Sequence, residues 1–180
     1  ISESARATYG KAGAISIITG RDLSFTGVIG GELSLGSTLM GYSGNVGGAL
    51  KIQAGRISVG GGSQAGALVL NDGFFSTGGF SSYGLTGIGA ASRNPPIPGE
   101  METYAPAISI ASGSRITPRV DSLIAERDMA LGGAFVLRRY QAPPGRATPV
   151  SLAFSALGAD DPFTPDTLEV RGDIVMEEGA

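Results

Sequence analysis

The sequence contains no cysteine, no histidine and no tryptophan. Without cysteine the fold has no disulfide bonds, so backbone ladders and apolar stacking must hold it together. Without histidine the chain lacks the most common general base and metal ligand of proteins. These absences argue against histidine-dependent catalysis, and the lack of cysteine suits a protein that crosses membranes unfolded.

Charged residues and long apolar runs are also scarce. Charged residues make up 16% of the chain, below the usual share of about 25%. The net charge of −3 and the isoelectric point of about 4.9 argue against a nucleic-acid binder. No run of about eighteen apolar residues is present, so we expect no membrane span. There is no complete P-loop or dinucleotide fingerprint, and we expect no cofactor.

Glycine, in contrast, is abundant, with 30 of the 180 residues. The usual share is about 7%. A glycine inside a helix or strand costs about 0.5–1 kcal/mol relative to alanine, so this many glycines are tolerable only where turns are frequent. The composition therefore favours many short strands over long helices.

A short phrase recurs along the chain, in which two large apolar residues flank one other residue. These apolar pairs begin at positions 15, 33, 50, 68 and 85, a step of 17 or 18 residues, and the phrase returns at 135, 152 and 168. A fixed step of this kind indicates a solenoid, in which each repeat buries its apolar side by stacking on its neighbours.

Alternating apolar residues within each repeat predict short strands, and the pairs Gly20-Arg21 and Gly55-Arg56 predict sharp turns. We therefore predict an all-β fold, a parallel β-helix whose coils of about 17–18 residues lie about 4.8 Å apart. Residues 1–180 would form a single segment of about eight to ten coils. The predicted core ladders contain Ile15, Ile17, Leu33, Leu35, Leu50, Ile52, Leu68 and Leu70.

Two other folds compete with this prediction. Leucine-rich repeats have a period of about 20–29 residues and need an asparagine or cysteine ladder after the strand, which the sequence lacks. A β-sandwich also has short strands and turns, but at a spacing of about 8–12 residues. The longer single period favours the β-helix, and the sandwich stays open as the alternative.

Two proline-rich stretches, at 90–106 and 138–149, interrupt the repeat. Because proline cannot donate to a strand ladder, we predict two loop insertions there. Residues 121–131 are compatible with a helix by composition alone. However, residues 126–132 echo the strand sequence of residues 20–26, which favours strand, turn and strand.

Three blocks of sequence carry a family resemblance. They are residues 20–24, residues 72–83, and residues 149–152 together with 168–174. These blocks, with the composition and the period, resemble large exoproteins of the filamentous haemagglutinin family, the secreted cargo of two-partner secretion systems. The resemblance extends over most of the chain, although none of its motifs is diagnostic alone.

The resemblance implies a right-handed parallel β-helix within a long surface fibre or adhesin, without catalytic residues. It also implies that the chain passes unfolded through an outer-membrane translocator barrel of a Gram-negative bacterium and folds outside, secreted or at the cell surface. The family's N-terminal secretion domain is not recognisable, so we expect an internal or C-terminal piece of a longer chain.

Arg171, Gly172 and Asp173 form the sharpest functional string in the sequence. This tripeptide can bind integrins when an exposed turn displays it, so it is a candidate adhesion site. Glycine also suits a corner between two strands. The dipeptides Arg-Gly and Gly-Asp also occur often by chance in a glycine-rich chain. The structural interpretation therefore competes with the adhesive one.

Phe74, Phe75, Phe80 and Tyr83 form an aromatic cluster. Exposed rings in a row could stack on sugar rings, so these residues are candidate glycan contacts. Aromatic side chains more often fill a solenoid core, where each buries about 150–250 Å². We therefore weigh glycan contact against core stacking.

The acidic groupings are Asp160, Asp161 and Asp166, and the pair Glu126 and Asp128. β-Helical enzymes that act on pectin use aspartates as calcium ligands or as an acid–base pair. A polygalacturonase-like site would also need a histidine, and the aspartate–proline sequence at 160–162 is typical of a turn. The glycines at 60–62 lack the aspartates of calcium-binding repeats. We predict neither catalysis nor a metal site.

The sequence thus predicts a structural or adhesive segment of an exoprotein fibre that binds a host-cell or bacterial-surface receptor or glycan through surface loops. One alternative is a β-helix that binds or cleaves polysaccharide, which an exposed row of acidic residues beside a groove would favour. The other is the stalk of a toxin-delivery exoprotein.

Overall fold

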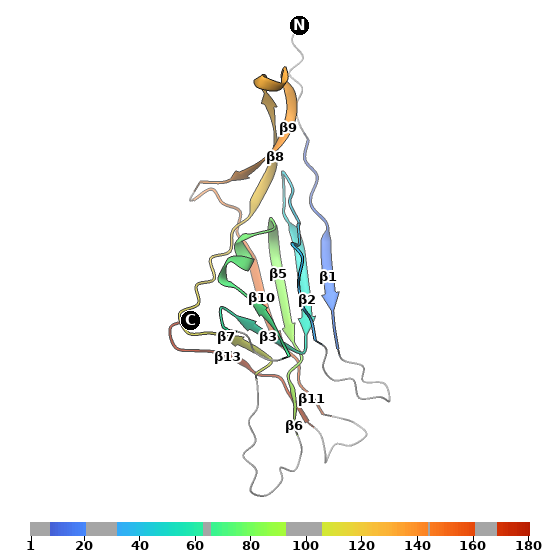
Figure 1. Cartoon of the computed structure of the whole chain (residues 1–180), viewed down its shortest axis with the longest axis vertical. Coiled ribbons are helices and arrows are strands. Elements are labelled where there is room, and N and C mark those ends of the chain that lie inside the picture. The colour runs from blue at the N-terminus through green and yellow to red at the C-terminus, as the bar shows by residue number, and fades with distance from the viewer. Residues whose placement is uncertain (1–7, 21–31, 63–65, 93–105, 144, 161–168) are drawn as a thin grey trace, which may run out of the picture.

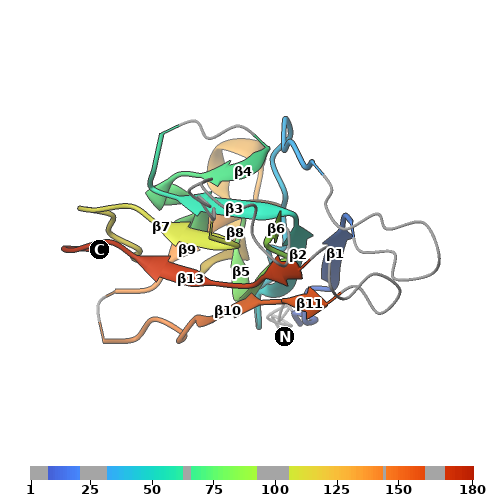
Figure 2. The same ribbon diagram turned by 90° about the horizontal axis from the view of Figure 1, so that it is seen from below.

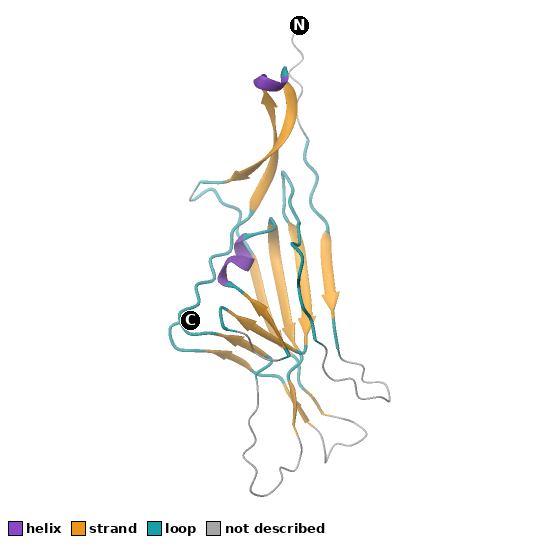
Figure 3. Cartoon of the chain, viewed as in Figure 1, coloured by secondary structure: helices purple, strands orange, loops and turns teal. Residues whose placement is uncertain are grey.

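The computed structural model describes residues 8–20, 32–62, 66–92, 106–143, 145–160 and 169–180. In these residues the chain forms thirteen strands and two short 3₁₀ helices (Figures 1 and 3). The predicted all-β class is confirmed. In the described part of the chain, no helix has the length and apolar character needed to cross a membrane.

Four parallel strands form the long sheet, in the order β1 (Ala14–Ile18), β2 (Gly48–Ala54), β5 (Phe80–Gly87) and β10 (Ser151–Ala156). Side chains alternate between the two faces of a strand, and the register aligns the core-facing ones in columns. One column contains Ile15, Leu50, Tyr83 and Leu152, and the next contains Ile17, Ile52, Leu85 and Phe154. The repeated apolar phrase therefore forms strands whose side chains have apolar neighbours in the next strand.

A second set of four parallel strands forms the short sheet, in the order β4 (Ala67–Leu70), β3 (Arg56–Val59), β7 (Ile108–Ile110) and β13 (Ile174–Met176). Its columns are Leu68, Ile57, Ile108 and Ile174, and Leu70, Val59, Ile110 and Met176. Both sheets contribute to one apolar core, whose thirteen buried residues are at most 3% exposed. We call the two sheets together the stacked body.

The chain passes from the long sheet to the short sheet through a corner rich in glycine. Gly55 alone separates β2 from β3, and its carbonyl oxygen accepts a hydrogen bond of 3.0 Å from the Gly89 N–H. A Cβ atom on Gly87 would lie only 2.3 Å from the carbonyl oxygen of Ala107. Glycine at 87 therefore lets two backbone segments approach more closely than any side chain would permit.

The sequence distance between stacked strands corrects the predicted coil length. Ile17 and Ile52 face each other at a separation of 35 residues, and Ile52 and Leu85 at 33. The step of 17–18 residues is therefore about half of the separation between these stacked residues. Between β2 and β5 the chain forms β3 and β4 of the short sheet before it returns to the long sheet.

The predicted core ladder is correct for Ile15, Ile17, Leu50 and Ile52, which stack in the long sheet. Leu68 and Leu70 are buried, but they lie opposite β3 in the short sheet, so the prediction that they continue the same ladder is wrong. Leu33 and Leu35 belong to no strand and pack, half-buried, against the core. The apolar phrase alone does not tell which sheet, if any, a segment joins.

An antiparallel hairpin projects from one end of the stacked body (Figure 1). It consists of β8 (Asp121–Asp128), η2 (Met129–Leu131) and β9 (Ala134–Gln141). A strand followed by a turn is thus found at 121–131, where a helix was the alternative, and the second strand begins only at Ala134. Residues 135–137, which carry the repeated phrase, pair antiparallel with β8 rather than in a parallel coil. The prediction of a coil there is wrong, because the short turn at Gly132 (φ 68°) reverses the chain.

At the opposite end of the body, β11 (Ala159–Asp160), β12 (Glu169–Arg171) and β6 (Ala90–Ser92) form a small antiparallel sheet (Figure 1). The first predicted loop, 90–106, thus begins with a strand, and its residues 93–105 lie outside the described part. The second, 138–149, begins inside β9, which ends at Gln141.

Candidate functional site

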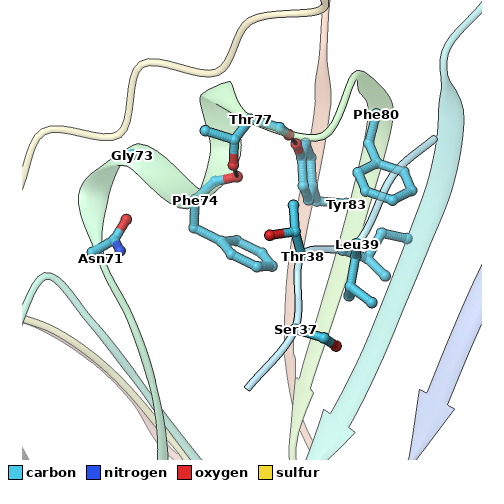
Figure 4. Close-up of a pocket in the computed structure, with 10 residues that line it drawn as sticks. Ser37, Thr38, Leu39, Asn71, Gly73, Phe74, Thr77, Phe80 and Tyr83 are labelled. Carbon is cyan, nitrogen blue, oxygen red and sulfur yellow. Dashed lines mark hydrogen bonds between the residues drawn. The ribbon is translucent and has the colours of Figure 1, made fainter. Parts of the chain in front are cut away.

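A pocket of about 260 Å³ lies where η1 (Asp72–Ser76) and residues 37–39 meet the ends of β2 and β5 (Figure 4). Small-molecule sites in proteins usually measure about 300–1,000 Å³. The pocket is therefore slightly smaller than a typical site and has room for a ligand of about one ring.

The turn that forms one wall of the pocket is fixed by its own hydrogen bonds. The Phe74 N–H donates to the Asn71 carbonyl oxygen at 3.0 Å, and the Thr77 hydroxyl donates to the Phe74 carbonyl oxygen at 3.1 Å. Gly78 and Gly79 follow with φ values of 78° and 73°, which glycine adopts without strain. These contacts hold the Phe74 ring over the pocket.

The aromatic cluster divides into buried and accessible rings. Phe75, Phe80 and Tyr83 are at most 1% exposed, and their rings pack edge to face, with the Tyr83 centroid 5.3 Å from that of Phe75 and 5.7 Å from that of Phe80. Phe74 is half-buried. Three of the four candidate glycan contacts are thus core residues, and Phe74 offers the accessible ring.

Tyr83 brings a hydroxyl group to the buried end of the pocket. Its hydroxyl donates a hydrogen bond of 3.0 Å to the Thr77 carbonyl oxygen. Burial, with a smaller contribution from Tyr42, raises the pKa of Tyr83 to about 12. At physiological pH the phenol is therefore neutral and acts as a hydrogen-bond donor.

The rim of the pocket carries exposed polar groups. Ser37, Thr38 and Thr77 contribute hydroxyl groups, and Asn71 contributes an amide (Figure 4). No charged side chain is among the described residues that line the pocket. An apolar ring next to hydroxyl and amide groups suits a neutral, polyhydroxylated ligand such as a sugar ring.

The Arg171, Gly172 and Asp173 string lies at a corner between β12 and β13. Arg171 pairs with Ala90 in the small sheet, and its side chain lies outside the described atoms. A Cβ atom on Gly172 would lie 2.3 Å from the Leu157 carbonyl oxygen, so this glycine is required by a close backbone contact. Asp173 has an exposed side chain, and its carbonyl oxygen accepts from the Ile108 N–H at 3.1 Å.

The acidic groupings do not come together at one place. Glu126 and Asp128 both face Arg138 across the hairpin, at 3.5 and 3.0 Å. Asp160 belongs to β11, while Asp161 and Asp166 lie outside the described residues. In the part of the chain that is described, no group of three or more acidic side chains is placed to hold a metal ion.

Sequence reasoning found the aromatic residues but missed the polar ones. Ser37 and Thr38 precede β2 by about ten residues and belong to no strand, so no periodic pattern marks them. Asn71 and Thr77 flank η1, and the pair Gly78-Gly79 is the signal that could have indicated a tight turn there.

Comparison with known proteins leaves the chain without an assigned family. No family model, curated protein or solved structure matches it.

Proposed function

We propose that this chain is a right-handed parallel β-helical segment of a secreted or surface-exposed exoprotein fibre, with a structural and adhesive role and no catalysis. The observation that carries the proposal is the set of in-register apolar columns across parallel strands in two sheets. Columns of this kind lengthen with each added coil, which is how a solenoid shaft is built.

The order of the strands supports the helical path. The chain visits the long sheet and then the short sheet three times, in β2 and β3, β5 and β7, and β10 and β13. Parallel strands joined by such crossovers are right-handed in about 98% of known cases. β4 departs from this order, because it lies on the side of β3 away from β7.

Adhesion would use the parts that project from the shaft. The hairpin exposes Met129, Leu131 and Leu137 at 81, 62 and 68%, and these side chains would contact the receptor. Passage through an outer-membrane translocator barrel and display on a Gram-negative cell complete the proposal, and these two points rest on the family resemblance.

A second candidate function, glycan binding, is favoured by the pocket at Phe74. The pocket combines one accessible aromatic ring with three hydroxyl groups and one amide, and its lining carries no charge. The ligand would be a single neutral sugar unit of a surface polysaccharide.

Binding of the purified chain to cultured epithelial cells and to a glycan panel tests both functions, after far-UV circular dichroism has confirmed a β-rich fold. For adhesion, we expect cell binding that is lost when residues 122–140 are replaced by a short glycine–serine turn. Cell binding that survives this replacement but is lost in Asp173→Glu would move the adhesive site to the corner at Gly172. A folded chain that binds no cells would contradict the adhesive role.

For glycan binding, we expect Phe74→Ala to weaken the affinity about tenfold, equal to about 1.4 kcal/mol. Phe135→Ala is the matched control, because Phe135 is a half-exposed ring on the hairpin, away from the pocket. Equal losses in both variants, or no binding to any glycan, would rule out the pocket as the binding site.

A further inference from the structure

The last strand of each sheet leaves its core-facing side chains partly exposed, and in the long sheet Leu152 and Phe154 of β10 are half-buried. In the short sheet, Ile108 is fully buried, but Ile174, its neighbour in β13, is 39% exposed. Ile110 is 3% exposed, and the adjacent Met176 is 63% exposed. β10 and β13 lie along the same side of the body (Figure 2). This side is the continuation of the coil-on-coil interface that the rest of the chain buries.

The outer edge of β10 also carries unpaired backbone groups. N–H groups alternate between the two sides of a strand in a parallel sheet. Because the Leu157 N–H donates to the Gly87 carbonyl oxygen of β5, the N–H groups of Leu152, Phe154 and Ala156 face away from β5. Within the described residues, these outward groups have no hydrogen-bond partner.

This edge lacks the features that normally prevent strand addition. Natural edge strands are blocked by lysine, proline, bulges or inward-pointing charges. Neither β10 nor β13 contains a charged residue or a proline. By contrast, the free edge strand of the hairpin, β9, contains Arg138 and Arg139.

The opposite edge of the long sheet offers a matching strand. β1 is likewise free of charge and proline. Its Thr19 N–H donates to the Gln53 carbonyl oxygen of β2, so by alternation the N–H groups of Ser16 and Ile18 face outward. Its core-facing residues, Ile15 and Ile17, are half-buried, as are Leu152 and Phe154 of β10.

We propose that β10 of one copy pairs in parallel with β1 of a second copy, in the register of the three steps inside the chain. Ile15 of the second copy would then stack on Leu152, and Ile17 on Phe154. The two edges differ, so each pairing leaves another edge free and copies add head to tail. This inference goes beyond the proposed function, because a shaft made of one chain needs no second copy.

Proline substitutions on the two edges test the proposal, with association measured by sedimentation velocity over a concentration series. Ser16→Pro and Ala156→Pro each remove one outward N–H and leave the internal ladder intact, a placement that proline tolerates on edge strands. We expect the parent chain to form head-to-tail oligomers. Each variant alone should be monomeric at concentrations at least tenfold above those at which the parent associates.

Mixing the two variants gives the decisive result. Ser16→Pro keeps an intact β10 edge and Ala156→Pro keeps an intact β1 edge, so an equimolar mixture should form 1:1 dimers and nothing larger. Formation of these dimers would also show that both variants are folded. A parent chain that stays monomeric would overturn the proposal, and so would variants that associate as the parent does. A self-dimer of Ser16→Pro would indicate β10 pairing with β10 instead.

A charge pair, introduced into the two proline variants, tests the register. In the proposed pairing the exposed side chain of Ser155 lies opposite that of Ile18 of the second copy. With Ser155→Lys carried by the Ser16→Pro chain and the change at Ile18 carried by the Ala156→Pro chain, neither chain can self-associate. The mixture with Ile18→Glu should then associate at least tenfold more strongly than the mixture with Ile18→Lys. Equal association in the two mixtures would exclude this register.

Discussion

The stacked body and the β8–β9 hairpin place similar strand sequences in very different surroundings. Ile52 of the body is 1% exposed and has Ile17 and Leu85 beside it in neighbouring strands. Leu137 of the hairpin is 68% exposed and has Ala125 as its cross-strand neighbour. The same kind of apolar side chain is thus buried in the body and exposed on the hairpin, so only the one in the body contributes much to stability.

The two regions also hold their polar groups differently. The body has few internal charges and depends on backbone ladders and apolar columns. The hairpin carries the ion pairs of Arg138, and Arg127 stacks on the Phe135 ring at 4.9 Å. Exposed pairs of this kind contribute about 0–1 kcal/mol each, so the comparison predicts a rigid body and a weakly stabilised projection.

The largest expected difference between the two regions comes from a buried charge. Ile52→Asp would place an unpaired carboxylate in the core and should lower the free energy of unfolding by more than about 4 kcal/mol. Leu137→Asp, the same kind of change on the hairpin, should alter it by less than about 0.5 kcal/mol. Urea denaturation followed by circular dichroism measures both. Similar midpoints for the two variants would remove the distinction between body and hairpin.

A smaller difference is expected at two glycines. Gly87→Ala would place a methyl group 2.3 Å from the Ala107 carbonyl oxygen, and we expect a loss of about 2 kcal/mol from the resulting backbone shift. Gly132→Ala in the hairpin meets no atom within 4 Å, but its φ of 68° is unfavourable for alanine, which costs about 1 kcal/mol. Thermal melts measure the stability loss of each variant. A larger loss in Gly132→Ala would show that the backbone at Gly87 shifts to accommodate a methyl group at little cost.

The smallest effect is expected from single hydroxyl groups. Tyr83→Phe removes the bond to the Thr77 carbonyl oxygen and should cost about 1 kcal/mol at neutral pH. Tyr140→Phe, on the half-exposed ring of the hairpin, should cost less than about 0.5 kcal/mol. Equal losses of unfolding free energy in the two variants at neutral pH would mean that the hydroxyl of Tyr83 contributes no more than that of a surface residue.

The pH dependence of Tyr83 sharpens this test. Because its pKa is raised from 10.0 to about 12 in the folded chain, the unfolded chain releases this proton first as the pH rises. The contribution of Tyr83 to the free energy of unfolding is therefore constant below pH 10 and falls between pH 10 and 12. Tyr83→Phe should remove this contribution to the loss of stability between pH 10 and 12. Parallel stability curves for parent and variant from pH 10 to 12 would mean that Tyr83 ionises as it does in the unfolded chain.

The sequence is sufficient for the class of fold and for half of the core ladder. Ile15, Ile17, Leu50 and Ile52 stack as predicted, although at about twice the predicted step, because parallel strands in register repeat the same side-chain pattern. The spacing did not reveal that Leu68 belongs to the other sheet, since both sheets use the same apolar alternation. The hydrophobic period therefore predicts neither which sheet a segment joins nor whether it forms a strand, as Leu33 and Leu35 show.

The candidate pocket was less predictable than the core. The aromatic cluster was visible, but burial separates Phe74 from the other three rings, and burial depends on contacts between distant segments. Ser37 and Thr38 reach the pocket because residues 37–39 lie beside η1, more than thirty residues later in the chain. No local signal encodes a contact of that kind.

The excursion between β5 and β10 has a consequence for how such a chain can change over time. Leu85 and Phe154 stack in adjacent strands although they are 69 residues apart, about twice the separation of Ile52 and Leu85. Doubling the length of a closed loop costs only about 0.6 kcal/mol of chain entropy. One buried methylene group, at about 0.8 kcal/mol, offsets that cost. A lineage built on this architecture can therefore gain, lose or exchange projecting modules between coils while its core stays intact.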